Sequence, residues 1–184
     1  MAPGGVHVND SRTVGLVQLR VKGVCVLVSS GCEDRGMVMC DYFAASGDAV
    51  AVRVLDQPGG PDPATFDVVP LKGIDPVVAM AQLEAILTGC TYDEASERPR
   101  AGQLFSSPDA ASAFIVSVSD TLQEALASAT HVSLAEAAGP WSETDELRQG
   151  GITSGTGLDV LVLLAALAGR ARPAGLRLYC WWAL

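Results

Sequence analysis

The sequence predicts an α+β fold, in which helices cover a largely antiparallel sheet. Its first third reads as short strands with short links, which favour antiparallel neighbours because parallel strands need a longer crossover. The remainder mixes helical and strand patterns, so a βαβ crossover there keeps an α/β fold as the alternative. The 184 residues fit a single domain over 1–184, with a candidate sub-boundary at 57–64 and a flexible tail expected at 1–11.

The N-terminal third is expected to form an antiparallel β-meander of four strands. In "TVGLVQLRV" the alternation places Val17, Leu19 and Val21 on one face, with Gln18 and Arg20 on the other. The dipeptide "KG" then favours a tight hairpin to "VCVLVSS". The segments "MVMCDYF" and "DAVAVRVLD" complete the meander. After the break "QPGGPDPA", a further strand is expected in "TFDVVPL".

The rest of the chain is expected to alternate helices with single strands. In "DPVVAMAQLEAILTGC" Asp75 can cap a helix, Pro76 fits its first turn and Gly89 can end it. The polar stretch from Thr91 to Gln103 is expected to be a surface loop. A short helix in "SPDAASA", a strand in "FIVSVS" and a helix in "DTLQEALASA" follow, then a polar loop or short helix in "SETDELRQGG". The apolar residues after Gly157 predict a buried helix, and "GLRLYCWWAL" predicts a C-terminal strand.

Composition argues against several classes of partner and cofactor. The formal charge is −9 and no basic stripe is present, so neither nucleic acid nor an anionic membrane is an expected partner. The longest apolar run, Val160–Ala168, is too short to span a bilayer. Five cysteines without a C-x-x-C pair, beside His7 and His131, do not predict a metal site, and no cofactor is expected. The N-terminus lacks the regions of a secretory signal, so a cytoplasmic location is expected.

The glycine-rich loop "GGITSGTGLDV" is the first candidate site. It lacks the lysine of a Walker loop, and Val160 stands where a dinucleotide loop needs its third glycine. Asp159 in the first turn would repel a phosphate. Two interpretations remain, a structural helix cap or a loop that binds a ligand through free backbone N–H groups. The ligand-binding residues would be Ser154, Gly155, Thr156 and Gly157.

Two single residues are candidates for catalysis. Asp41 lies within a predicted strand, where burial would raise its pKa unless a partner such as Arg53 on the next predicted strand compensates. A structural ion pair or a solvent-facing position are the other interpretations of Asp41. His131 is a candidate general base towards Ser133 or a distant serine, although no G-x-S-x-G pattern occurs.

The C-terminal strand carries the candidate interface, formed by Tyr179, Trp181 and Trp182. The adjacent tryptophans must point to opposite faces of a strand, so either both faces are covered within the chain or one meets a partner. A charged fraction of 18% and a mean hydropathy of +0.30 fit a subunit that hides surface in a homo-oligomer. The leading hypothesis is a non-enzymatic protein-interaction or structural subunit that self-associates or docks on a partner protein. The alternative is a small intracellular α/β enzyme or small-ligand sensor with its site around the Gly150–Asp159 loop.

Overall fold

The computed structural model describes residues 16–21, 24–29, 38–106 and 112–183. The chain divides into two compact units, residues 1–35 and residues 36–184. The tail expected at 1–11 and most of the short helix expected in "SPDAASA" lie outside the described residues.

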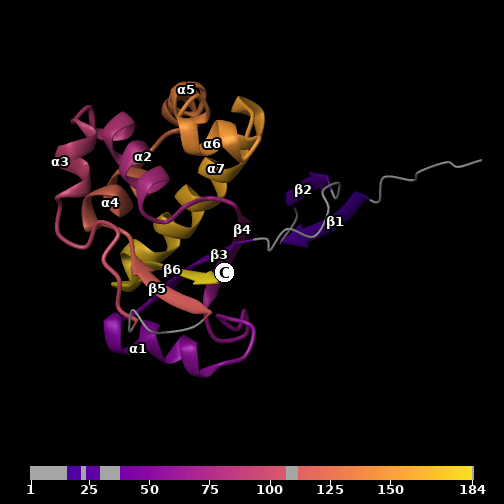
Figure 1. Cartoon of the computed structure of the whole chain (residues 1–184), viewed down its shortest axis with the longest axis vertical. Coiled ribbons are helices and arrows are strands. Elements are labelled where there is room, and N and C mark those ends of the chain that lie inside the picture. The colour runs from indigo at the N-terminus through magenta and orange to yellow at the C-terminus, as the bar shows by residue number, and fades with distance from the viewer. Residues whose placement is uncertain (1–15, 22–23, 30–37, 107–111, 184) are drawn as a thin grey trace, which may run out of the picture. The chain divides into compact units, whose positions relative to one another are not determined.

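The first unit contains a β-hairpin. Strands β1 (Leu16–Val21) and β2 (Val24–Ser29) pair antiparallel as a sheet of two strands (Figure 1). Val21 lies opposite Val24 at the turn, and Leu16 lies opposite Ser29 at the open end. The hairpin predicted from the alternation and the "KG" link is therefore confirmed.

The second unit is built on a four-stranded antiparallel sheet, which gives the α+β fold predicted from the sequence. The strand order is β4–β3–β6–β5, so the chain's last strand lies between β3 and β5. The bounds are β3 (Met39–Ala45), β4 (Asp67–Lys72), β5 (Ala113–Ser117) and β6 (Arg177–Ala183). Each of these four strands lies largely within a segment that the sequence predicts to be a strand.

The strand predicted in "DAVAVRVLD" is wrong. These residues form helix α1 (Asp48–Val52) and the 3-10 helix η1 (Arg53–Asp56). Ala51 and Val54 lie three residues apart, on one helical face, and both are completely buried. The alternating valines favour a strand, but the buried face consists of Ala51 and Val54, which follows the helical spacing, so tertiary packing selects the helix.

Helices cover one face of this sheet, and α1 with η1 lies on the other (Figure 1). The long core helix α7 packs against α4 and α5 and also contacts β3, β4 and β6. The indole Nε1 of Trp141 donates to the Ala79 carbonyl at 2.9 Å, which joins α5 to α2. The helices of this layer are α2 (Val78–Thr88), α3 (Tyr92–Ser96), α4 (Asp120–Ser128), α5 (His131–Ser142), α6 (Asp145–Gln149) and α7 (Ser154–Ala171), followed by η2 (Arg172–Ala174).

Helix α7 is long and apolar. By length and composition alone, residues 154–174 are apolar enough to cross a membrane. Its buried positions include Leu161, Leu164 and Leu167, which belong to the core shared with the sheet. These contacts are those of a core helix that packs on both helices and strands.

The polar stretch from Thr91 to Gln103 is more ordered than the sequence suggested. It begins with α3, where the Thr91 hydroxyl accepts from the Glu94 backbone N at 3.2 Å. The Glu94 carboxylate in turn accepts from the Thr91 backbone N at 2.8 Å. The Thr-x-x-Glu spacing in the sequence is typical of such a reciprocal capping box. Because α3 forms here, the prediction of a loop throughout this stretch is wrong.

Candidate functional site

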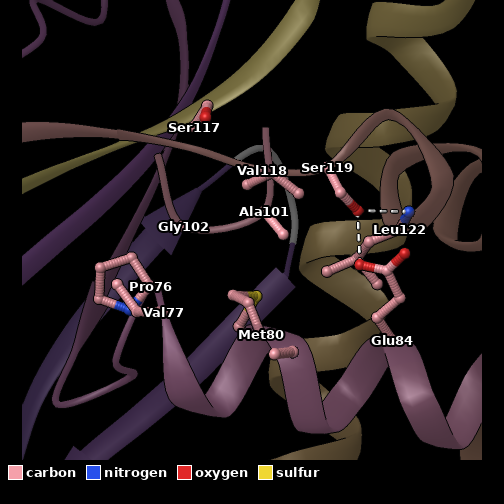
Figure 2. Close-up of a pocket in the computed structure, with 11 residues that line it drawn as sticks. Pro76, Val77, Met80, Glu84, Ala101, Gly102, Ser117, Val118, Ser119 and Leu122 are labelled. Carbon is pink, nitrogen blue, oxygen red and sulfur yellow. Dashed lines mark hydrogen bonds between the residues drawn. The ribbon is translucent and has the colours of Figure 1, made fainter. Parts of the chain in front are cut away.

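A small cavity lies between α2, the turn at Ala101 and Gly102, the end of β5 and the start of α4 (Figure 2). Its volume of about 10 Å³ is close to the minimum that a single water molecule needs. The cavity is therefore too small for an organic substrate. Its lining residues are Pro76, Val77, Met80, Ala81, Glu84, Ala101, Gly102, Ser117, Val118, Ser119 and Leu122.

Glu84 is the buried acid beside this cavity, with 1% of its surface exposed. One carboxylate oxygen accepts from Arg98 Nη1 at 2.6 Å, and the other accepts from the Ser119 hydroxyl at 2.5 Å. The Ser119 hydroxyl also accepts from the Leu122 backbone N at 3.0 Å, as Figure 2 shows. Both oxygens of Glu84 are thus engaged within the chain, and the group joins α2 to α4.

A second polar cluster is centred on Arg100, whose φ of +70° is unusual for a residue other than glycine. Its Nη1 lies 2.7 Å from Asp48 Oδ1, and its Nε lies 3.2 Å from Asp120 Oδ1. The guanidinium also lies over the Tyr179 ring, 5.1 Å from the ring centre. The cluster thereby ties the loop after α3 to α1, α4 and β6.

Neighbouring groups determine the protonation states of Asp48 and Tyr179 in this cluster. The Tyr179 hydroxyl donates to Asp48 Oδ1 at 2.6 Å, and that bond, with the one from Arg100, lowers the pKa of Asp48. Burial, reinforced by the bond to Asp48, raises the pKa of Tyr179 to about 12. Tyr179 is therefore neutral and Asp48 ionised at pH 7, so neither is poised to exchange a proton there.

The expected ligand loop forms the first turn of α7. Thr153 is the N-cap: its hydroxyl accepts from the Thr156 backbone N at 3.3 Å. The Ser154 hydroxyl is 3.0 Å from that of Ser142 in α5. A Cβ added at Gly157 would lie 3.6 Å from the Ala138 carbonyl oxygen, so this glycine sits closely against α5. These contacts fit the structural-cap interpretation, and ligand binding at Ser154, Gly155, Thr156 and Gly157 stays a prediction.

His131 is the exposed first residue of α5. The nearby Ser133 hydroxyl accepts from the Thr130 backbone N at 2.9 Å and so takes part in the cap of this helix. The first turn of α7 contacts Ser142, at the opposite end of α5. A helix of this length separates His131 from Ser142 by about 16 Å. His131 and the glycine-rich loop therefore do not meet.

Asp41 lies on β3, opposite Pro70 of β4 and Trp181 of β6. Burial raises its pKa, and the charge of Lys72 acts in the opposite direction. In this part of the chain Arg53 makes no ion pair with Asp41, because Arg53 lies in η1 rather than on an adjacent strand. The proposed ion pair between them is therefore wrong.

The structure places the two catalytic candidates on different faces of the sheet. Asp41 shares a face with Phe43, which packs in the cluster containing α1 and η1. His131 begins α5, on the face covered by the helical layer. Asp41, His131 and the first turn of α7 thus occupy three separate places, whereas a shared active site requires one.

The aromatic residues of β6 are largely enclosed by the chain itself. Tyr179 is fully buried and Trp181 is 8% exposed, both in the cluster with Phe43. Trp182 faces the helical layer, is half-buried and lies 5.9 Å, centre to centre, from the Phe114 ring. Of the three expected interface residues, only Trp182 therefore retains substantial surface for a partner.

The Arg100 and Glu84 clusters were not found from the sequence. Asp48 and Tyr179 are 131 residues apart, and Glu84 and Ser119 are 35 apart, so no local spacing signals either contact. Among the described residues, no group of three or more His, Cys, Asp or Glu side chains could hold a metal ion. Comparisons with family models, with curated proteins and with solved structures find no match.

Proposed function

We propose that this chain is a non-enzymatic protein-interaction subunit that docks through its β1–β2 hairpin. The observation that carries the proposal is that β1 and β2 form a sheet of two strands, with no third strand pairing to them among the described residues. A hairpin of two strands is at best marginally stable in water, and a third strand or a packing partner stabilises it.

The register of the hairpin defines an aliphatic face. Residues that lie directly opposite each other share a face, and faces alternate along each strand. Val17 lies opposite Val28, Leu19 opposite Val26, and Val21 opposite Val24. One face therefore holds only valine and leucine, and such a residue gains about 1.5 to 3 kcal/mol when it becomes fully buried. A cover for this aliphatic face is the contribution we expect from a partner protein.

The edges of the other sheet are less suited to receive a partner strand. Edge strand β4 contains Pro70, which has no N–H to donate, and Asp67 at its start is ion-paired with Arg170. Beside β5, the Phe105 backbone N donates to the Ile115 carbonyl at 2.9 Å, so a short segment covers that edge. These features support the hairpin as the element that docks.

The rest of the second unit favours a scaffold over an enzyme. The cavity beside α2 has room for about one water, and the buried acid beside that cavity is engaged by Arg98 and Ser119. The candidates Asp41 and His131 lie apart from the first turn of α7. Trp182 is a further candidate contact, whereas Tyr179 and Trp181 stabilise the interior.

The proposal is tested by the native size of the full-length chain in an extract of its host cells. The wild type is expected to migrate well above its 19.0 kDa monomer mass on size exclusion. Val26→Lys, on the aliphatic face, should reduce that size, whereas the matched Gln18→Lys on the other face should not. A wild-type chain that migrates as a monomer in the extract would contradict a docking function.

A further inference from the structure

We infer that the hairpin's partner is a second copy of this chain, joined through β2 to β2 in antiparallel register about a two-fold axis. This inference rests on the proposed function and specifies its partner. Two hairpins joined in this way form a sheet of four strands, which passes the size at which sheets become independently stable. The contact is isologous, so each copy contributes the same edge.

Strand β2 is the edge that lacks protection against pairing. Its sequence, "VCVLVS", contains no charge, proline or glycine. Natural edge strands commonly carry charges or proline that prevent such pairing, and apolar segments without them pair readily. Strand β1 carries Arg20 within it, so its edge is the less favourable one for a second copy.

The sequence of β2 is self-complementary about Val26. With Val26 on the two-fold axis, Val24 lies opposite Val28 of the other copy, and Cys25 lies opposite Leu27. The even-numbered residues are those of the aliphatic face, so this register joins the two aliphatic faces into one. A register that sets even-numbered residues opposite odd-numbered ones would place the aliphatic face of one copy beside the other face of the second copy.

The distribution of charge indicates which parts of two copies meet. Residues 1–35 contain four basic and three acidic residues, a net charge of +1. Residues 36–184 contain eight basic and eighteen acidic residues, a net charge of −10. Two second units therefore repel each other, whereas two hairpins approach with little electrostatic cost.

The register is tested by disulfide trapping in the full-length chain. Cys25, Cys32 and Cys90 are replaced by serine, and Cys40 and Cys180 are kept because both are buried. Val26→Cys should give a covalent dimer on oxidation with copper phenanthroline. Directly opposed residues have Cα atoms about 4.5 to 5.5 Å apart, within the range of a disulfide. The matched Val24→Cys should not cross-link, because each position 24 lies opposite position 28 of the other copy. The two cysteines are then four residues apart along the strands.

The outcomes separate this inference from the proposed function. A purified chain of twice 19.0 kDa, with trapping at position 26 and not at 24, supports the β2–β2 contact. Equal trapping at both positions overturns the register. A purified monomer that is larger in the extract overturns self-pairing but leaves docking on another protein intact. A purified monomer whose second unit unfolds at lower temperature after Val26→Lys shows instead that the hairpin packs within its own chain.

Discussion

Among individual residues, Gly60 controls how closely the "QPGGPDPA" segment approaches the sheet. Its φ is +88°, and a Cβ added there would lie 2.8 Å from Trp181 Cε3. Both the backbone conformation and the contact therefore require glycine. This glycine covers the Trp181 ring, which explains why that tryptophan is buried without a partner chain.

Gly60→Ala is expected to lower the free energy of unfolding by about 2 to 4 kcal/mol, because backbone strain and overpacking add. Gly59→Ala is the matched control: its φ is +89°, but no atom lies within 4 Å of the added Cβ. The control should cost only about 1 to 2 kcal/mol. Urea unfolding of both variants measures the difference, and equal losses would show that the Trp181 contact contributes nothing.

Tyr179 makes stability depend on pH in the alkaline range. Its folded pKa of about 12 lies above its ordinary value of 10, so its stabilising contribution is complete below pH 10. That contribution is lost as the pH rises from 10 through about 12, because the unfolded chain releases the proton more readily. Tyr179→Phe should therefore show a shallower fall in the free energy of unfolding over this range. An unchanged slope would mean that Tyr179 does not titrate with folding.

Among the helices, α4 and α7 begin with hydroxyl caps that differ in one respect. Ser119 caps α4 and also donates to the buried Glu84 carboxylate, whereas Thr153 caps α7 at an exposed position. Ser119→Ala should cost about 2 to 3 kcal/mol, since a cap and a charge-assisted bond are lost. Thr153→Ala should cost about 1 kcal/mol. Chemical denaturation measures the free energy of unfolding of both variants. A loss of stability at Ser119 no larger than that at Thr153 would show that the Ser119–Glu84 hydrogen bond does not stabilise the start of α4.

Local signals were sufficient for elements with defined ends. Helix α2 ends at Gly89, in the left-handed conformation, and Asp75 accepts from the Val77 backbone N at 2.8 Å before the helix begins. The alternating pattern also located β1. Residues 48–56 were misassigned because the alternation of Val50, Val52 and Val54 predicts a strand, whereas the residues that become buried are Ala51 and Val54. Tertiary packing against Phe43 and Tyr179 decides that case.

The candidate sites depended much less on local signals. The alternation rule correctly separates Trp181 and Trp182 onto opposite faces, but it does not say what covers each face. Gly60 and Phe114, which supply that cover, lie far from them in the sequence. The same holds for Asp48 and Arg100, whose contact follows from the fold alone.

For the chain as a whole, apolar composition has two separate causes. In the second unit, both faces of the sheet are covered, so most apolar residues serve one chain's interior. In the first unit, the hairpin has an aliphatic face and two edges to which no further described strand pairs. The apolar residues on which the proposed oligomer depends are therefore those of β1 and β2, two strands of 6 residues each.

Self-association is addressed most directly by the solution mass of the purified full-length chain, measured by light scattering over a dilution series. We expect a dimer of twice 19.0 kDa that dissociates on dilution, because β2–β2 pairing is a reversible equilibrium. Val26→Lys should be monomeric throughout, and Gln18→Lys should behave as the wild type. A wild-type mass of 19.0 kDa at every concentration would contradict pairing between copies.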